Sequence, residues 1–544
     1  MSIVYFVLML GGLIFFHEFG HFLVARLFGV RVLEFSIGFG PKIGAFERGH
    51  TTYRIGLLPL GGYVKMLGAD PLNDATEEIA PPDSFARKPL WQRSLIVLAG
   101  PVFNFILPLP IFFLLFLSEG LVPPSTIGTM APDGVAARAG LMPGDAVRSI
   151  DGDEVHGWWQ LERAVSGSGG KTMTLGVERD GVALAPITIT PDVVTDVIAP
   201  ELGLTRDVGR IQIELGYRRP IVMVTPGSAA AAAGLQSWDE IVAIGSSPVD
   251  RYTSVLKTVG ALTDPTTLRV LRRVPVKGLN ADLAEFETRE AVTVTYSPKA
   301  GDGTVGLSSS EFVIADVAQD TAAAKAGLVA GDEIIAIDGM KKSSWGVLLN
   351  EIRSLPGERR TLTVRRNGED RAVQLTFDVR EEKGEFNTDT QEVVIGLSQR
   401  SGYAAPEPVE NQSRLSFAAI RTWTETTKVF ALTAASLAGL FTGKLGIKSM
   451  GGPIFIYEVA SRTDSEGWNY FFTVMAWLSI SLGLINLVPI PVLDGGHLLL
   501  FLMEGIRRRP LSLRTRQIAF YIGFSFIAVL MVLVFRNDIM RAYF

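Results

Sequence analysis

The segment Phe16–Phe22, with the sequence FHEFGHF, constrains this chain most, because it places ionisable side chains inside an apolar run. On a helix, His17 and His21 lie one turn apart on the same face, which is the spacing of two zinc ligands. Glu18 lies beside them, where a carboxylate can deprotonate a metal-bound water. The same pattern arises by chance on soluble helices. Within a membrane, however, an ionised side chain costs roughly 2.5–3.5 kcal/mol or more, so the context predicts a metal site.

Composition divides the chain into membrane and soluble parts. Of its 544 residues, 47% are hydrophobic and 20% are charged, and the mean hydropathy is +0.28. These values are too apolar for an ordinary soluble protein and too charged for a protein that lies entirely in the membrane. The net charge of -5 gives no case for nucleic acid as a partner. The absence of cysteine excludes disulfides, thiolate nucleophiles and cysteine-ligated metals.

Hydropathy predicts a multi-span α-helical membrane protein with four transmembrane helices. They are expected over residues 1–30, 94–118, 468–506 and 517–536. The first lacks a basic leader region and a small-residue cleavage site, which favours a retained span over a signal peptide. Residues 413–466 form an amphipathic helical region. Its uncharged part, 429–443, is short for a span, so an interfacial or packed amphipathic helix and a buried core helix both remain open.

The loop 31–93 is rich in Lys and Arg and contains a predicted membrane-associated β-hairpin, with strands over 35–46 and 51–66. A second basic loop, 507–516, lies between the last two spans. The positive-inside rule therefore places both loops in the cytoplasm, with the active site near that side. Both termini and everything between spans two and three are then expected on the periplasmic side.

Between those spans the sequence repeats. A motif A-G-L-x-x-G-D, followed by I-D-G, has its first glycine at 140 and 327, with a weaker copy at 234. The spacings of 94 and 93 residues predict three copies of one unit, over 122–205, 206–307 and 308–401. The motif resembles bacterial PDZ domains, which are small α+β barrels that bind extended peptides by strand addition. In the middle copy Trp238 and Gly245 replace motif residues, so this copy is read as degenerate and as a spacer.

The third span carries a second motif, N-L-V-P-I-P-V-L-D-G-G-H, over 486–497. Two prolines and a glycine pair break the helix at membrane depth and could bring Asp494 to the metal as a third ligand. An Asp that merely ends a helix at the interface is the alternative. His497 could replace it as a ligand, or could support the site or the start of a helix. Asn104, in the second span, could line the site or pack between helices.

These motifs together, with G-P-V-F-N at 100–104 and G-G-Y-V-K at 61–65, resemble the site-2 protease family of intramembrane zinc metalloproteases, of the bacterial RseP type (peptidase family M50B). The resemblance implies one catalytic Zn²⁺ on His17, His21 and Asp494, with Glu18 as the catalytic base. It implies that Asn486 and the hairpin hold an unwound substrate. The expected substrate-binding residues are Asn486, Asn104, Gly61, Gly62, Tyr63, Val64 and Lys65.

The resemblance also implies a bacterial inner-membrane protein that cuts transmembrane substrates such as anti-sigma factors after a first cut, or remnant signal peptides. Peptides on the PDZ-like units and membrane lipid are the other expected partners. The three units depart from the two that are usual in this family, so roles are not transferred unit by unit. A membrane-tethered PDZ scaffold or chaperone, and a transporter with a midplane helix break, are the rival functions.

Overall fold

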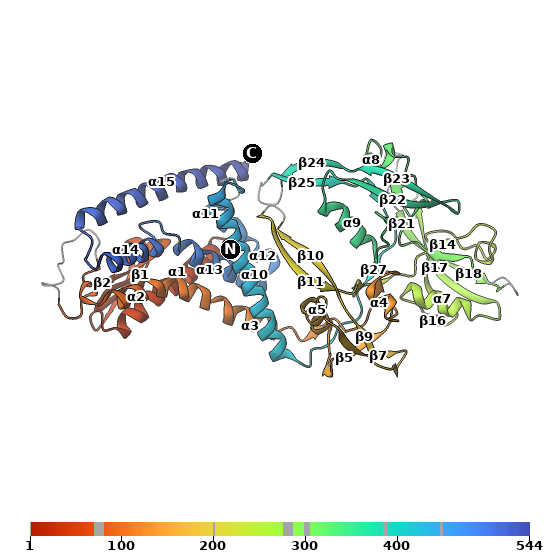
Figure 1. Ribbon diagram of the computed structural model, residues 1–544, viewed down its shortest axis with the longest axis horizontal. Helices are drawn as coiled ribbons and strands as arrows, with labels where there is room; N and C mark the ends of the chain where they lie inside the picture. The colour runs from red at the N-terminus through yellow and green to blue at the C-terminus, as the bar shows by residue number, and fades with distance from the viewer. Residues whose placement is uncertain are drawn as a thin grey trace.

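The computed structural model describes residues 2–69, 81–199, 202–275, 287–298, 305–383, 389–446 and 450–543. Figure 1 shows two halves, a helical one that holds both ends of the chain and a β-rich one built from its middle. The chain leaves the helical half after α3 (Pro108–Leu117) and returns along α10 (Arg414–Thr442). The β-rich half is therefore one long insertion into a helical framework.

Among the residues that the structure describes, four helical segments are long and apolar enough to cross a membrane, as the sequence predicts. They are α1 (Ser2–Leu27), α2 (Leu90–Ile106) continued by α3, α13 (Trp468–Asn486) and α15 (Leu513–Tyr543). The span predicted over 468–506 is a helix, an irregular loop and a second helix, α14 (Asp494–Arg507), because the two prolines interrupt the backbone hydrogen bonding. The chain is therefore an integral membrane protein.

The helix α10 is not among the four spans, and it packs along α3 and α13. Next to this contact, Phe105 at the end of α2 and Phe430 of α10 place their ring centroids 5.6 Å apart. Two short helices, α11 (Pro453–Ser461) and α12 (Thr463–Glu466), then lead into α13. Within 429–443 Gly439 is buried, whereas Phe430 and Phe441 are exposed, so this stretch packs on its neighbours along one side and is not a buried core helix.

Glycine allows α1 and α2 to approach closely. A Cβ atom at Gly20 would lie 2.4 Å from the carbonyl oxygen of Ala99, so no larger residue fits there without movement. Met9 and Leu13, which precede Gly20 in α1, are buried with Phe471 and Val474 of α13. The helix that carries the two histidines is thus held on both sides.

The predicted hairpin is present as β1 (Val32–Arg48) and β2 (Thr51–Met66), joined at residues 49 and 50. Both strands bend, so the first half of β1 pairs with both halves of β2: Phe35 lies opposite both Tyr53 and Val64. The second half of β2 is therefore an edge of this small sheet. Phe35 packs on Phe22 of α1, with 5.4 Å between ring centroids. The predicted loop over 31–93 also includes residues 70–80, which lie outside the described residues.

The β-rich half contains three hydrophobic cores, one for each sequence repeat. Elements around the first core are β3 (Leu121–Val122), β4 (Thr129–Met130), α4 (Val135–Arg138), β5 (Ala146–Ile150), β6 (Asp153–Glu154), α5 (Trp158–Gly167), β7 (Met173–Arg179), β8 (Val182–Ala183), β9 (Ile187–Ile189), β10 (Asp192–Ala199), β11 (Leu204–Arg210) and β12 (Ile213–Glu214). This core reaches Ile211 and Ile213, past the predicted boundary at 205, because β11 pairs with β10 and β12 with β4.

The second and third cores lie within their predicted ranges. The second unit comprises β13 (Tyr217–Arg218), β14 (Val222–Val224), α6 (Ala229–Ala232), β15 (Glu240–Ile244), β16 (Ser247–Pro248), α7 (Tyr252–Gly260), β17 (Thr266–Pro275), β18 (Glu287–Tyr296) and β19 (Leu307–Ser309). The third comprises β20 (Asp316–Val317), α8 (Ala322–Lys325), β21 (Glu333–Ile337), α9 (Trp345–Ser354), β22 (Arg359–Arg366), β23 (Glu369–Thr376), β24 (Asp378–Lys383), β25 (Asp389–Val394) and β26 (Leu397–Ser398).

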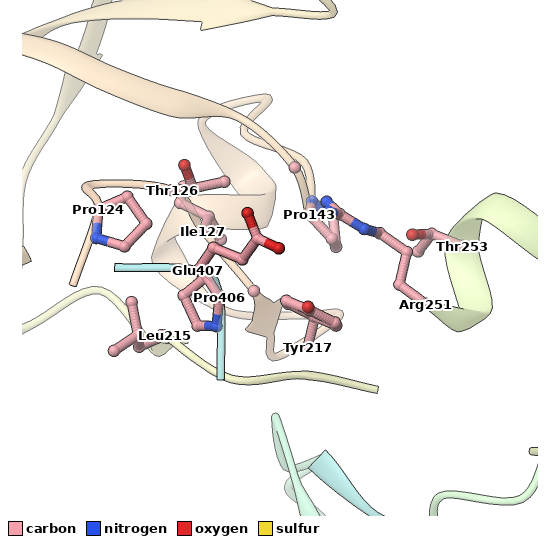
Figure 2. Close-up of a pocket in the computed structure, with 12 residues that line it drawn as sticks. Pro124, Thr126, Ile127, Pro143, Leu215, Tyr217, Arg251, Thr253, Pro406 and Glu407 are labelled. Atoms are coloured by element: carbon pink, nitrogen blue, oxygen red, sulfur yellow. The ribbon is translucent and has the colours of Figure 1, made fainter. Parts of the chain in front are cut away.

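The segment that returns to the membrane ties the three units together. Its strand β27 (Tyr403–Ala404) pairs with β13, and β28 (Val409–Glu410) pairs with β3, the first strand after the second span. A cavity of about 230 Å³ lies between the first two units and this segment, with Tyr217, Arg251 and Glu407 among its lining residues (Figure 2). The array is therefore joined at its base to α3 and α10.

Candidate active site

Three predicted ligands converge from two distant parts of the sequence. His17 and His21 face the same way on α1, and Asp494 is the first residue of α14. Nε2 of His17 lies 3.2 Å from Oδ2 of Asp494, and Nε2 of His21 lies 3.5 Å from Oδ1. One ligand atom from each residue lies within 4.8 Å of the others. Among the described residues, this group does not include His497.

The tautomer of neutral His21 follows from its neighbour. Its Nδ1 lies 2.8 Å from the carbonyl oxygen of Ile96, which can only accept a hydrogen bond, so Nδ1 carries the proton. The Nε2 of the neutral ring then presents a lone pair to Asp494 and to His17 Nε2, which is 3.4 Å away. Oδ2 of Asp494 is buried without a hydrogen-bond donor. Lone pairs that face one another in a buried site need a cation, and the His–His–Asp set suits zinc.

Two asparagines surround His17. Asn104 is fully buried, and its Nδ2 lies 3.0 Å from Nδ1 of His17. Its Oδ1 has no partner among the described residues. An amide turned by 180° would direct that oxygen to an Nδ1–H, leaving His17 Nε2 free as a ligand. Asn486, the last residue of α13, lies 3.4–3.5 Å from both ring nitrogens of His17. Both predicted residues thus lie against a metal ligand.

The break between α13 and α14 is a strained loop held by glycine. Val492 has φ +108°, a backbone conformation that β-branched residues rarely adopt. A Cβ at Gly495 would lie 2.2 Å from the carbonyl oxygen of Leu487, so the first turn of α14 presses directly on the loop. On the other side, Gly523 of α15 leaves no room for a Cβ beside the carbonyl oxygen of Pro491. The loop that presents Asp494 is therefore fixed from two sides.

Gly100 is a site residue that the sequence marked only as part of a motif. A Cβ at this position would lie 2.3 Å from His21 Nε2 and 2.9 Å from His17 Cε1. The backbone of α2 therefore forms the floor beneath both imidazoles. Gly523, by contrast, carries no sequence signal, because its contact is made to a loop more than thirty positions away.

The predicted substrate-binding strand, 61–65, lies beside Glu18. A Cβ at Gly62 would lie 2.6 Å from Ile14 Cγ2 and 3.1 Å from Glu18 Cγ, so glycine allows the strand to touch α1. The backbone N–H of Val64 also lies close enough to interact with the Glu18 carboxylate. Side chains alternate along a strand, so Tyr63 points the other way.

On that opposite face, the Tyr63 hydroxyl donates to Glu34, with 2.9 Å between oxygens, and the same carboxylate accepts a hydrogen bond from Arg54 at 3.0 Å. Lys65 is exposed, and Gly61 lies against the ring of Phe39. The structure therefore brings Gly62 and Val64 close to Glu18, whereas Gly61 and Tyr63 contact β1 and Lys65 is exposed.

Comparison with known proteins agrees with this geometry. Residues 5–530 match the profile of peptidase family M50. The chain is 29% identical to protease RseP of Yersinia pestis, over 99% of this chain and 98% of that protein. It is also 29% identical to the regulator of sigma-E protease RseP of Escherichia coli K12, over 98% of each chain. A Vibrio cholerae protein provisionally named a zinc metalloprotease is equally similar over 98% of each chain. The family match spans nearly every element described above, so this chain belongs to peptidase family M50.

Proposed function

We propose that this chain is an intramembrane zinc metalloprotease that hydrolyses peptide bonds within the transmembrane segments of single-span membrane proteins. The observation that carries the proposal is the convergence of His17, His21 and Asp494 in a buried cluster beside the carboxylate of Glu18. Relatives named as zinc metalloproteases support the choice of metal. A scaffold or a transporter would leave this cluster without a role.

Zinc held by His17, His21 and Asp494 would lower the pKa of a water molecule to about 7 and polarise the peptide carbonyl. Glu18 takes the proton of the attacking water and returns it to the leaving amine nitrogen. Asn104 orients the ring of His17 through Nδ1, and Asn486 lies on the open side of the same ring. Polar partners behind metal ligands commonly change metal affinity or activity 10- to 100-fold.

The sheet edge at 61–66 provides a place for the substrate backbone. A transmembrane helix hides its carbonyls in internal hydrogen bonds, so it must unwind before water can attack. An unwound segment could add as a strand to the edge of β2, which would satisfy the freed backbone groups. The contact of Gly62 and Val64 with Glu18 then sets the scissile bond beside the base.

The array over 121–401 serves, in this proposal, as PDZ-like units on the periplasmic side that limit which substrates enter. Its first strand pairs with β28 between α3 and α10, so its base is held next to the membrane half. Globular units of this size have a radius of gyration of roughly 12–13 Å, enough to exclude a bulky ectodomain. A stump left by an earlier cut would pass, and relatives named regulators of sigma-E protease favour anti-sigma factors as substrates.

The test is purified enzyme in detergent with a single-span membrane peptide, analysed by mass spectrometry of the products. Glu18→Gln should retain zinc and lose cleavage, because the amide cannot accept the proton. Glu47→Gln, the same change on the exposed part of β1, is the matched control and should cleave normally. Cleavage that persists in Glu18→Gln would refute the role of Glu18 as the base. If the wild-type enzyme makes no cut within the transmembrane segment, the proposed function is refuted.

A further inference from the structure

A second cavity, of about 70 Å³, lies where α2, α14 and the first turns of α15 meet. Its polar lining consists of Arg93, Arg516, Glu504 and His497. The remainder is largely apolar and includes Leu500, Phe501 and Phe520. The cavity therefore combines cationic groups with an apolar wall.

Within the described part of the chain, one of its two arginines has a counter-ion and the other does not. Glu504 is buried, and it accepts hydrogen bonds from Arg93 at 3.3 Å and from the Leu511 N–H at 3.1 Å. Arg93 also lies over the ring of Phe501. For Arg516, the described residues provide no ion pair, and its Nε is buried without a hydrogen-bond partner. Arg516 as a whole is partly buried, and its buried Nε–H lacks an acceptor, so an anion at this position would be stabilised by both charge and a hydrogen bond.

The cavity lies at one boundary of the membrane half. The pair formed by Arg93 and Glu504 joins the start of α2 to the end of α14, and α15 begins nearby at Leu513. Trp91, at the same end, is largely exposed, as expected of an aromatic residue at the level of lipid headgroups. The adjoining loop carries Arg507, Arg508 and Arg509. A basic boundary of this kind attracts anionic lipid.

We infer that this cavity binds a phosphate group, supplied by the headgroup of an anionic phospholipid whose chains lie along Phe520 and Leu500. Arg516 makes the charge-assisted hydrogen bonds to the phosphate. The apolar wall favours a lipid over free phosphate. Because Pro491, Val492 and His497 also line the cavity, the lipid braces the loop and helix that present Asp494.

The test is native mass spectrometry of the full-length protein in detergent, with phosphatidylglycerol as the probe and diacylglycerol as its phosphate-free counterpart. Wild type should retain phosphatidylglycerol and release diacylglycerol. Arg516→Gln should weaken retention by about tenfold or more, since charge-assisted hydrogen bonds are lost. Arg514→Gln, which removes the same charge from an exposed position on the same turn, should retain it.

Equal retention of phosphatidylglycerol by wild type and Arg516→Gln would overturn the inference. Equal loss of the lipid in Arg516→Gln and Arg514→Gln would overturn it as well. Displacement of the lipid by inorganic phosphate at the same concentration would assign the cavity to free phosphate and overturn the lipid assignment. If Arg516→Gln does not fold, Arg516→Lys replaces it, because it preserves the charge but loses the planar fork. Retention by Arg516→Lys at the wild-type level would then contradict the proposed recognition.

Discussion

The two halves of the molecule treat buried aspartates differently. In the array, each copy of the repeated motif buries one aspartate against a strand arginine that lies 33 or 34 positions later. The pairs are Asp145–Arg179, Asp239–Arg272 and Asp332–Arg366, with nitrogen–oxygen distances of 2.6–2.9 Å. Each aspartate also accepts a backbone N–H of its own turn. In the membrane half, Asp494 faces two histidines, and its Oδ2 has no donor among the described residues.

This contrast distinguishes structural from functional burial. A carboxylate that already has an arginine partner and a backbone N–H donor needs no further ligand. Even the degenerate middle copy preserves this ion pair. A carboxylate among imidazole lone pairs is complete only when a cation binds. The same residue type therefore serves the fold in one half and, in the proposed function, the chemistry in the other.

The largest expected effect separates the two kinds of aspartate directly. Asp494→Asn should reduce zinc affinity by more than the roughly 10–100-fold typical of partners behind a ligand, and should lower cleavage to background. Asp332→Asn should leave zinc content and cleavage of a short substrate unchanged. Metal analysis of the two purified variants makes the comparison. Equal zinc in both would remove the distinction between the halves.

Gly100→Ala sharpens the comparison without touching a ligand. The new methyl group would lie 2.3 Å from His21 Nε2, so the imidazole must move away from Asp494. Zinc affinity should fall by roughly 10–100-fold, measured by competition with a chelator. Gly11→Ala is the control, since a Cβ there meets nothing within 4 Å. Unchanged zinc affinity in Gly100→Ala would show that the backbone of α2 moves to accommodate the methyl group, which would contradict its role in positioning the imidazoles.

In the array, Asp332→Ala should lower the melting temperature of the third unit by roughly 10 °C, because Arg366 and the Val329 N–H lose their acceptor. Burial works to raise the pKa of Asp332, but hydrogen bonds from Arg366 and Val329 outweigh it and hold the pKa below its usual value. The pair therefore stabilises the unit at neutral pH, and that stability is lost as pH falls through the lowered pKa.

The control for this change is Asp370→Ala, which removes an exposed ion pair with Arg365 and should have little effect. Thermal unfolding monitored by limited proteolysis of the full chain provides the measurement. An equal loss in both variants would contradict the structural role of the buried pair.

The smallest expected effect concerns Glu311, a buried acid of the array. Its Oε1 accepts a hydrogen bond from the Trp345 N–H, but its Oε2 has no hydrogen-bond donor among the described residues. Burial raises its pKa to about 7, and nearby Glu214 adds to the shift, although the Trp345 N–H and Arg218 oppose it. Because the pKa of Glu311 is higher in the folded state, the protonated carboxyl stabilises the fold. This stabilisation is fully present below about pH 4.5 and is lost as pH rises through about 7. Between pH 5.5 and 8, the melting temperature should fall more in wild type than in Glu311→Gln. Parallel curves would contradict this assignment.

The sequence predicted the parts whose signals are local. The helical spacing of His17 and His21, the prolines around 490 and the repeated motif each depend on neighbouring residues, and the four spans and the strand pair at 32–66 are present. The bend that pairs β1 with both halves of β2 was not predicted, because register shifts leave no simple pattern. The contacts of Gly100 and Gly523 also could not be foreseen, since they depend on helix packing between distant segments.

The same limit explains the position of Asn104. Its sequence context allowed either a site-lining or a packing role, and the structure gives it a contact of each kind. Its side-chain amide lies on His17, and its backbone carbonyl oxygen accepts a hydrogen bond from the hydroxyl of Ser479 on α13 at 2.8 Å. Only the tertiary structure shows that one residue connects the proposed site to two helices.

The central claim is that His17, His21 and Asp494 together hold one zinc ion, and X-ray absorption at the zinc K edge of the purified chain tests it most directly. The account predicts about one zinc per chain, surrounded by nitrogen and oxygen donors, with outer-shell scattering from two imidazole rings and no change in Glu18→Gln. A spectrum without imidazole scattering, or an undiminished zinc signal in Asp494→Asn, would contradict it.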